Sequence, residues 1–592
     1  MSQHDVTRAG GALFADGGPD GLLHRAFLRG SGFTGDDVRR TPIVGICTSW
    51  SELNPCNAGL RELAARVKDG VRAAGGTAIE FPTISISEPF TRPTSLFLRN
   101  LMSMDVEETI SSAPIDGVVL LGGCDKTVPA QLMGAISANK PAVMVTAGPR
   151  PVGCRGGAPF TIDDVWPAME QRRLALMTDD EWRALEEDIV SGPGTCNVLG
   201  TAITMAAIAE VLGFALPGSA LPAAASEQRA AIAMQSGVQI VETIRHGRTP
   251  QSLVTPASLE NAFRVTCALG GSTNAVIHLE AIAGRCGLRI GTQRCRVWAS
   301  STPYIANVRP GGRMLLEDLH EAGGVPAIMT RIATLLHTEA HCSAGTPWQA
   351  VLDATTHVEH PAITSTDAPM SPRGALTVLH GNLAPRGAVL KTAGTHDTRL
   401  LQHRGPAVIF DGLADLHARI DDPALDVTPD SVLVLRGMGV LGAPGMPEVG
   451  HIPIPAKLAR AGVTDLLRLS DARMSGTATG TVVLHITPEA AAGGPLGLLQ
   501  TGDVIELDTA AGIIRHHVPE DVMRARVPLA LAKTPARGYA WLHRAHAMQP
   551  DAGCDFDFLR GTASAETDAS WRIGDRVGDA DGMANQQRGR DA

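Results

Sequence analysis

Long apolar runs are missing from this sequence. No stretch approaches the roughly 20 apolar residues that a membrane-spanning helix needs, and the longest runs, such as residues 118–121, have the length of a strand. The first residues also contain no apolar core of a secretory signal. We therefore expect a cytoplasmic protein that does not insert into membranes.

Basic tracts, paired cysteines and aromatic residues are also scarce. The formal net charge is −10, which argues against non-specific binding of nucleic acid. Ten cysteines are scattered without a CxxC pair, so in a reducing compartment we expect thiols or metal ligands rather than a disulfide framework. Aromatic residues make up only 4%, whereas glycine occurs 64 times, which predicts many turns and close backbone contacts.

The composition and the length indicate a folded protein of more than one domain. Hydrophobic residues make up 44% of the 592 residues and charged residues 19%, which is typical of globular chains. A chain of this length exceeds one ordinary hydrophobic core, so two or three domains are expected.

The first part of the chain alternates short apolar runs with amphipathic helices. The pattern predicts strands at residues 41–47, 77–85, 116–121 and 141–146. It predicts helices at residues 60–71, 94–110 and from 127 onward. Such alternation is typical of an α/β fold with a doubly wound, mostly parallel sheet. Ligands bind such sheets in the loops beyond the carboxyl ends of the strands.

The remainder of the chain changes character twice. Added helices are predicted at residues 197–213, 226–245 and 324–337. After about residue 370, short β runs predict a β-rich, barrel-like domain; they lie at residues 376–379, 407–410, 432–435, 481–486 and 504–507. We predict an N-terminal domain over residues 1–375 and a C-terminal domain over 376–592, with a loose tail after about residue 561.

Three cysteines lie in loops that open into helices. Cys56 lies in SELNPCN, Cys124 in GGCDKTVP directly after an apolar strand, and Cys196 in GPGTCNVLG. A helix N-terminus favours thiolates, and soft thiolates suit iron–sulfur clusters and zinc. A lone cysteine is most often a small buried apolar residue, so the spacing alone leaves both interpretations open.

Carboxylates form a second set of candidate ligands. Glu88 lies in SISEPF, Asp125 adjoins the second of these cysteines, and Glu448 lies in GMPEVG. Carboxylate oxygens suit Mg²⁺, although solvated loop charges are the simpler interpretation of each residue alone. Lys126 is either an ion-pair partner of Asp125 or an amine whose pKa burial lowers, which would make it available for modification.

A serine in SDARMSGTATG completes the candidates. Ser475 lies in a turn rich in Gly and Thr, where serine usually serves as a cap or turn residue. It becomes a candidate base only if a nearby metal lowers the pKa of its hydroxyl.

With these segments in place, the sequence resembles the family of dihydroxy-acid dehydratases and phosphogluconate dehydratases, specifically its sugar-acid branch. The resemblance runs from about residue 20 to 561. The matching segments are PIVGICTSWSELNPCN, EFPTISISEPFTRPTSLFLRNLMSMDVEE, GGCDKTVPAQLMG, GGSTNAVIHL, LEDLHEAGGVPAIM, GNLAPRGAVLK, GMPE, SDARMSGTATG and GCDFDFLRG.

The resemblance implies an active site between an N-terminal α/β domain and a C-terminal barrel-like domain, at the interface of a homodimer or homotetramer. It implies that Cys56, Cys124 and Cys196 hold a [2Fe–2S] cluster, with [4Fe–4S] as the alternative. The implied Mg²⁺ ligands are Glu88, Asp125, Glu448 and a Lys126 that is carbamylated by CO₂. Ser475 is similar to the catalytic serine, and Thr477 lies where the substrate carboxylate is held.

The implied reaction is loss of water from a 2,3-dihydroxy acid to give a 2-keto-3-deoxy acid. The substrate would be an aldonate such as arabinonate, xylonate, galactonate or fuconate. Cluster iron would act as a Lewis acid on the 3-hydroxyl and Mg²⁺ would hold the carboxylate and the 2-hydroxyl, while a Ser475 alkoxide removes the C2 proton.

Three other interpretations compete with a sugar-acid dehydratase. A dihydroxy-acid dehydratase of branched-chain amino-acid biosynthesis is the nearest, but SWSELNPCN and CDKTVPA favour the sugar-acid branch. A metal-binding protein without catalysis is disfavoured because Ser475, Lys126 and Glu448 are intact. A nucleotide-binding enzyme is disfavoured because no GxGxxG or GxxxxGK[ST] occurs in the right context. Residues 150–160 and 302–312, with the segment TCNVLGTAIT, depart from the family pattern, so they bear on which sugar is accepted.

Overall fold

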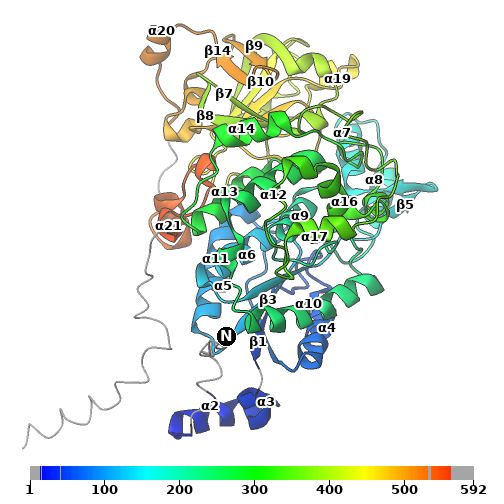
Figure 1. Ribbon diagram of the computed structural model, residues 1–592. Coiled ribbons are helices and arrows are strands. Elements are labelled where there is room, and N and C mark those ends of the chain that lie inside the picture. The colour runs from blue at the N-terminus through cyan, green and yellow to red at the C-terminus, as the bar shows by residue number, and fades with distance from the viewer. Residues whose placement is uncertain (1–13, 15–16, 41, 531–534, 562–592) are drawn as a thin grey trace, which may run out of the picture.

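A computed structural model describes residues 14, 17–40, 42–530 and 535–561 of the chain (Figure 1). The predicted loose tail after residue 561 lies outside the described residues. Two short helices, α2 (Pro19–Gly30) and α3 (Gly35–Arg40), precede the first strand and lie at one end of the molecule.

A four-stranded parallel sheet forms the base of the N-terminal part. Its strands run in the order β2-β1-β3-β4, and all neighbouring pairs are parallel. The strands are β1 (Ile43–Thr48), β2 (Thr77–Pro82), β3 (Gly117–Gly122) and β4 (Ala142–Thr146). The predicted doubly wound α/β sheet is therefore confirmed, although the second strand ends at Pro82 rather than at residue 85.

Alternation of side chains along these strands explains why helices cover both faces. Val44 and Ile46 of β1 pack with α4 (Leu60–Ala73) and α10 (Glu227–Arg245) in one apolar cluster. Ile43 and Cys47 point the other way, into the main core with α5 (Ser95–Ser112) and α6 (Thr127–Ala138). Because successive strand residues face opposite sides, a strand that is apolar throughout requires helices on both faces.

Helices fill the space between the sheet and the second domain. The longer ones are α9 (Thr201–Val211), α12 (Pro256–Leu269), α13 (Asn274–Arg285) and α14 (Thr292–Ser301). The helix predicted over residues 324–337 is shorter than expected, since α16 (Gly324–Arg331) is followed by the 3-10 turn η2 (Ala333–Leu335). The other helices of this part are α11 (Pro250–Leu253), α15 (Leu316–Glu321) and α17 (Trp348–Ala354).

A small subdomain lies in the chain between the sheet and these helices. It contains the hairpin β5 (Gly153–Arg155) and β6 (Ala158–Phe160), the turn η1 (Ile162–Asp164), and the helices α7 (Val165–Arg173) and α8 (Asp179–Ile189). Phe160, Ala168 and Leu185 give it a small apolar cluster of its own.

The second domain is a closed barrel, as the β-rich pattern predicted. Its strand order is β10-β11-β12-β8-β7-β14-β13-β9. The strands are β7 (Leu376–Gly381), β8 (Ala384–Lys391), β9 (Gln402–Asp411), β10 (Val432–Arg436), β11 (Arg468–Ser470), β12 (Val482–Thr487), β13 (Val504–Asp508) and β14 (Ile513–His516). Its helices are α18 (Gly412–Arg419), α19 (Ala456–Arg460) and α20 (Glu520–Ala525). The sequence pattern missed β8, β11 and β14, and the boundary at residue 375 stays a prediction.

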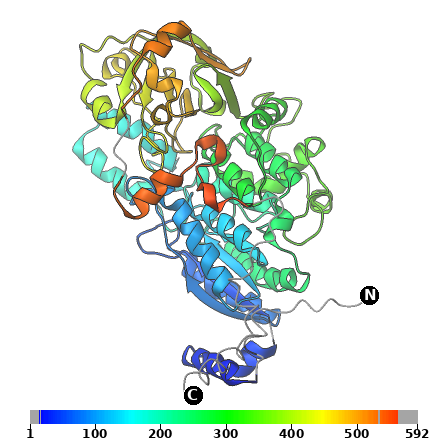
Figure 2. The same cartoon turned by 90° about the vertical axis from the view of Figure 1, so that its left-hand side faces the viewer.

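After the barrel, the chain returns to the N-terminal part (Figure 2). Helix α21 (Gly538–His546) packs on α5, where the rings of Tyr539 and Phe97 lie 5.0 Å apart. Asp555 of the GCDFDFLRG segment forms a buried ion pair with Arg285, at 2.7 Å. This segment therefore joins the end of the described chain to α5 and α13.

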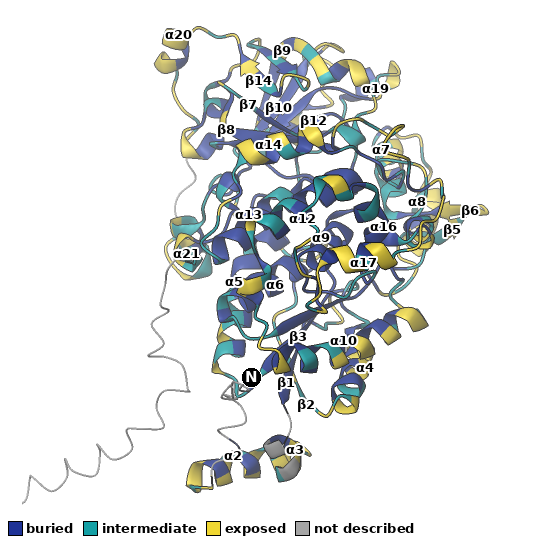
Figure 3. Cartoon of the chain, in the orientation of Figure 1, coloured by how far each residue is buried: buried dark blue, intermediate teal, exposed yellow. Residues whose placement is uncertain are grey.

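Burial follows the two cores. The sheet, the central helices and the barrel strands are mostly buried, whereas α2, α8 and α20 show exposed faces (Figure 3). Among the described residues, we find no helix with the length and apolar character needed to cross a membrane.

Candidate functional site

The loops that follow the four parallel strands emerge side by side at one edge of the sheet. Thr48, the last residue of β1, lies opposite Pro82 of β2 and Leu121 of β3, and Gly122 lies opposite Thr146 of β4. The segments that carry Cys56, Glu88 and Cys124 begin at this edge, as does the segment that begins with residue 147.

Asn57 joins the first cysteine loop to the second. Its Oδ1 accepts hydrogen bonds from the backbone N–H groups of Gly123 and Cys124, at 2.9 and 3.2 Å. A Cβ on Gly123 would lie 2.6 Å from the carbonyl oxygen of Cys56. Glycine at 123 therefore permits the close approach of the two loops.

The third cysteine loop is tied to the first by the backbone. Gly194 N–H donates to the Pro55 carbonyl at 3.1 Å, and Thr195 N–H donates to the Gly148 carbonyl at 2.9 Å. Gly194 has a φ of +121°, and a Cβ there would meet the backbone of Arg150 at 2.8 Å. The segment GPGTCN thus needs its second glycine to reach Cys56.

The three cysteines lie in neighbouring loops, and Arg150 acts on two of them. The Cys124 thiol hydrogen-bonds Cys56, and this bond together with the nearby charge of Arg150 lowers the pKa of the Cys56 thiol despite burial. Burial raises the pKa of Cys196 to about 12, with Arg150 opposing it. Arg150 is 6% exposed, and its Nε donates to the Thr195 carbonyl at 3.0 Å. The contact with Cys56 and burial raise the pKa of the Cys124 thiol as well. The buried guanidinium therefore favours the thiolate form at Cys56, whereas Cys124 and Cys196 stay thiols in this arrangement.

Three carboxylates converge on the other side of Cys124. The ligand atoms of Glu88, Asp125 and Glu448 all lie within 4.8 Å of one another. Lys126 lies among them: it pairs with Asp125, and its Nζ is 3.0 Å from Glu448 and 3.6 Å from Glu88. Glu448 comes from the segment between β10 and α19, so the second domain completes this group.

Lys126 is subject to two opposing effects, its burial and the charges of the carboxylates. Its side chain is fully buried, and burial alone would lower the pKa of the amine. Asp125 and Glu448 outweigh burial and raise this pKa above its ordinary value. Lys126 is therefore an ion-pair partner of the carboxylates in the described structure, and its modification stays a prediction.

Neighbouring charges also shift the pKa of Glu88. Burial works against its ionised form, but Lys126 and Arg473 outweigh burial and lower the pKa of this carboxyl to about 2. Glu88 also accepts hydrogen bonds from Thr94 Oγ1 at 2.6 Å and from the N–H of Ser95 at 3.1 Å. Glu88 is thus held in the ionised form that a hard cation requires.

Two residues that the sequence motifs contained but did not assign hold Glu448 in place. Arg473 donates to Glu448 Oε1 at 2.6 Å, and Asn274 donates to the same oxygen at 2.8 Å. Asn274 Nδ2 also lies 3.3 Å from the Met474 carbonyl. Asn274 therefore connects the carboxylate group to the turn that carries Ser475. In the sequence, each of these two residues is only a polar side chain next to an apolar one, and this pattern does not indicate a role at the site.

The serine turn has a defined hydrogen-bond pattern. Ser475 Oγ lies 2.9 Å from Thr477 Oγ1 and accepts from the N–H of Thr477 at 3.3 Å. Trp166 of α7 donates its indole N–H to Thr477 Oγ1 at 3.0 Å. Because an indole N–H only donates, Thr477 keeps its own hydroxyl proton available for Ser475.

The segments that depart from the family pattern lie around this site. Arg150 contacts the cysteines, and the Arg309 carbonyl accepts from the N–H of Leu199 at 2.9 Å, three residues after Cys196. The Arg309 side chain pairs with Asp163 at 3.1 Å in the turn before Trp166. Both segments therefore support the loops of the third cysteine and of α7.

The donor sets fit two kinds of metal. Three thiols in neighbouring loops beside a buried cation are of the kind that holds an iron–sulfur cluster. The adjacent carboxylates suit Mg²⁺, since hard cations prefer oxygen ligands and the group presents one oxygen from each of three residues. Among the described residues, the structure thus brings all seven predicted ligands to one region, with Ser475 and Thr477 linked to it through Asn274.

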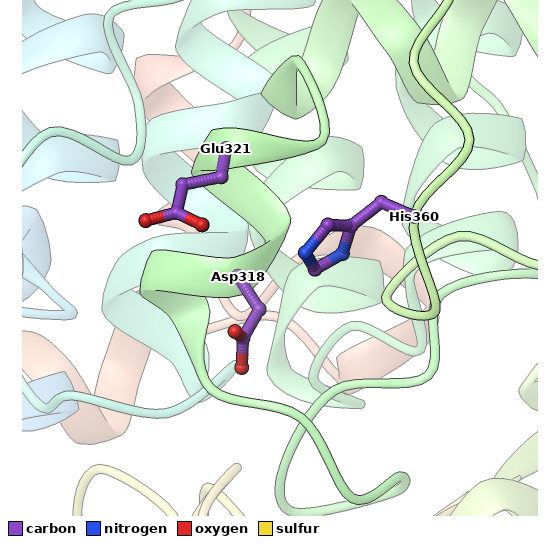
Figure 4. A group of neighbouring side chains, drawn as sticks. All are labelled: Asp318, Glu321 and His360. Atoms are coloured by element: carbon purple, nitrogen blue, oxygen red, sulfur yellow. The ribbon is translucent and has the colours of Figure 1, made fainter.

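A second cluster of possible ligands carries no such argument. Asp318 and Glu321 of α15 lie beside His360 of a neighbouring segment, with their ligand atoms within 4.8 Å of one another (Figure 4). His360 Nδ1 accepts the backbone N–H of Ala362 at 3.2 Å, and Asp318 accepts from Leu315 N–H at 2.7 Å. The neutral imidazole then carries its proton on Nε2, which leaves no lone pair for a metal.

Comparison with known proteins agrees with this geometry. Residues 41–351 match the family model for the dihydroxy-acid/6-phosphogluconate dehydratase N-terminal domain, and residues 361–554 match the model for the C-terminal domain. An L-arabonate dehydratase from Azospirillum brasilense is 44% identical, covering 93% of this chain and 97% of its own length.

The names of two further relatives specify different substrates. A 6-deoxy-6-sulfo-D-gluconate dehydratase from Pseudomonas putida is 43% identical, covering 91% of this chain and 94% of its own. A dihydroxy-acid dehydratase from Pyrobaculum calidifontis is 37% identical, covering 86% and 91%.

Proposed function

Because the chain belongs to the dihydroxy-acid/6-phosphogluconate dehydratase family and is a hydro-lyase, we propose that it dehydrates a 2,3-dihydroxy sugar acid to a 2-keto-3-deoxy acid. The observation that carries this proposal is the convergence of three cysteines, three carboxylates with Lys126, and the Ser475 turn in one region. Aldonates such as arabinonate, xylonate, galactonate and fuconate are the proposed substrates.

The names of the relatives support a sugar acid. The two relatives at 44% and 43% identity are named for sugar acids, whereas the dihydroxy-acid dehydratase is 37% identical. These acids differ in chain length and in configuration along the chain. We expect the sugar to be selected near Arg150 and Arg309, because both residues lie in segments that depart from the family pattern and support the loops of the site.

The proposed cofactors follow from the donor sets. Cys56, Cys124 and Cys196 would hold a [2Fe–2S] cluster, with [4Fe–4S] as the alternative, and Glu88, Asp125 and Glu448 would hold Mg²⁺. When bound, the cluster would act as a Lewis acid on the leaving hydroxyl, and Mg²⁺ would stabilise the negative charge that develops on the carboxylate side. Lys126 would join the ligands as a carbamate once Mg²⁺ offsets the negative charges that now keep its amine protonated.

The chain's own chemistry centres on Ser475. As an alkoxide, its Oγ would take the C2 proton; the electron pair of the C–H bond forms the C2–C3 double bond as the 3-hydroxyl leaves as hydroxide. The hydroxide and the proton held on Ser475 together make up the released water. The enol then tautomerises to the 2-keto acid. Thr477 stabilises the alkoxide through its hydroxyl and its N–H.

The experiment that tests the function is a turnover assay of anaerobically purified enzyme. We expect release of a 2-keto-3-deoxy acid from at least one of the four aldonates, and a visible spectrum typical of an iron–sulfur cluster. A colourless protein that is active only with added Zn²⁺ would refute the cluster.

A second candidate function is the dehydration of branched-chain dihydroxy acids. The relative from Pyrobaculum calidifontis supports it, since its name specifies a dihydroxy-acid dehydratase. Activity on dihydroxyisovalerate alone, with none of the four aldonates converted, would decide for it.

We also propose that the active enzyme is a homodimer or homotetramer. Light scattering of the same preparation measures its molecular mass.

Trp166 offers a prediction about the serine turn. Trp166→Phe retains an aromatic ring in the apolar cluster with Met474 and Val389 but removes the donor to Thr477. The alkoxide of Ser475 loses support, and its pKa rises because the charged form is disfavoured. We expect kcat/KM near pH 7 to fall about tenfold and its rising limb to move up by about one pH unit.

The matched control for Trp166→Phe is Trp541→Phe, since Trp541 is 46% exposed on α21. Its pH profile should match that of the wild type. A Trp166→Phe profile that is lowered uniformly, with the limb unmoved, would mean that Trp166 serves packing alone.

A further inference from the structure

Lys391 is a buried lysine that the family motifs contain without an assigned role. It is the last residue of β8, in the segment GNLAPRGAVLK, and it is 2% exposed. Lysine is almost never buried unless its charge is compensated. The contacts of its ammonium group therefore matter.

The described contacts of Lys391 leave its charge largely uncompensated. Its Nζ has one hydrogen bond, to the Gly476 carbonyl, and that bond is long at 3.5 Å. An ammonium group carries three donors. Asp163 is the acid that acts on it electrostatically, but Asp163 already pairs with Arg309 at 3.1 Å. Burial lowers the pKa of Lys391 to about 8, with Asp163 opposing this shift.

The direction of the side chain follows from the strand. Leu390 and Ala388 belong to the barrel core, whereas Val389 packs outside it with Met474, Ala478 and Trp166. Because side chains alternate along a strand, Lys391 lies on the same face as Val389. It therefore leaves the barrel toward the serine turn, where Gly476 separates Ser475 from Thr477.

We propose that Lys391 is a substrate-binding residue, whose ammonium group receives the carboxylate of the 2,3-dihydroxy acid beside the turn that carries Ser475. This inference rests on the proposed function and adds a cation to the carboxylate end of that site. It also explains why a lysine with one weak acceptor occupies a buried position.

The chemistry selects a carboxylate over other parts of the substrate. An ammonium group only donates hydrogen bonds, so its ligand must offer acceptors. A buried positive charge is compensated by a negative one, whereas hydroxyl groups leave it largely uncompensated. The carboxylate is also the charged group common to all 2,3-dihydroxy acids, whereas the chain beyond C3 differs among them.

The test compares a charged with an uncharged probe. The charged probe is 3-deoxy-arabinonate, which has no 3-hydroxyl to lose, and the uncharged probe is its carboxamide. Inhibition constants of both are measured against turnover by the metal-loaded enzyme, in the wild type and in Lys391→Met and Lys391→Gln. We expect the variants to weaken binding of the acid at least tenfold and binding of the amide less than twofold. KM for the substrate acid should rise in parallel.

The control is Lys457→Met, because Lys457 is exposed on α19, and it should leave both constants unchanged. If acid and amide weaken equally, or if neither weakens, Lys391 does not bind the carboxylate. The Lys391→Gln variant retains polarity and length, so a folding defect of Lys391→Met alone does not decide the outcome. Failure of the proposed function is distinct: the wild type would then convert none of the 2,3-dihydroxy acids, whatever the Lys391 variants do.

Discussion

Ser475→Ala is expected to lower kcat by about 10³-fold, within the usual contribution of a positioned general base, while the iron content and visible spectrum stay unchanged. The physical reason is that Ser475 lies in the second domain, whereas the three cysteines lie in loops of the first. Removing the hydroxyl removes the proposed proton acceptor without touching a cluster ligand. Steady-state kinetics with the best aldonate, together with iron and sulfide analysis, measure both quantities.

The control for this variant is Ser300→Ala, since Ser300 is exposed on α14 and donates only to the Val297 carbonyl of its own helix. It should retain wild-type turnover. If Ser475→Ala also retains turnover, the base must be another residue. If it loses iron, Ser475 supports the cluster and its kinetic effect says nothing about proton transfer.

Glu448→Gln is expected to abolish the response of the protein to Mg²⁺. Glu448 is the carboxylate that the second domain adds to Glu88 and Asp125. The amide keeps the shape of the side chain and an oxygen for Asn274, but it removes the negative charge beside Lys126 and Arg473. Metal Lewis acids contribute several kcal/mol to such reactions, so we expect kcat/KM to fall by about 10³-fold.

Thermal unfolding gives a second measure that does not depend on activity. A cation that binds only the folded state, at 100 times its Kd, stabilises that state by about 2.7 kcal/mol, so Mg²⁺ should raise the Tm of the wild type. Glu448→Gln should show no such rise, whereas Glu186→Gln, a change at an exposed position of α8, should respond like the wild type. Equal responses in all three proteins would contradict the assignment of Glu448 as a ligand.

The secondary structure of the sheet could be predicted because its signals are local. Each strand is a short apolar run, and each helix between strands has an apolar face, so a window of about a dozen residues contains the pattern. The missed strands lack this signal. β11 has only three residues, β14 has four, and β8 contains Pro385 and Gly387 among its eight. They are strands because barrel neighbours pair with them, which no local window shows.

The candidate ligands also divide into those that the sequence could place and those that it could not. Cys56, Glu88 and Asp125 follow strands of one parallel sheet, so the expected fold already places their loops at one edge. Glu448 and Ser475 follow barrel strands, and their place beside that edge depends on how the two domains pack. Before the fold was known, only the resemblance of whole segments connected them.

The sequence by itself determined the strands and loops of the N-terminal sheet, the kinds of side chain at the site, and, through its motifs, the family. The tertiary structure decided the electrostatic surroundings of the ionisable side chains. Lys126 and Glu448 are 322 residues apart in the chain, yet their contact keeps the lysine protonated where burial alone would favour the neutral amine. It also decided that Arg150 faces thiols, that Trp166 reaches Thr477, and that Lys391 meets no free carboxylate among its described contacts. Electrostatic energy depends on distance and burial, and both are fixed only when segments remote in sequence are packed together.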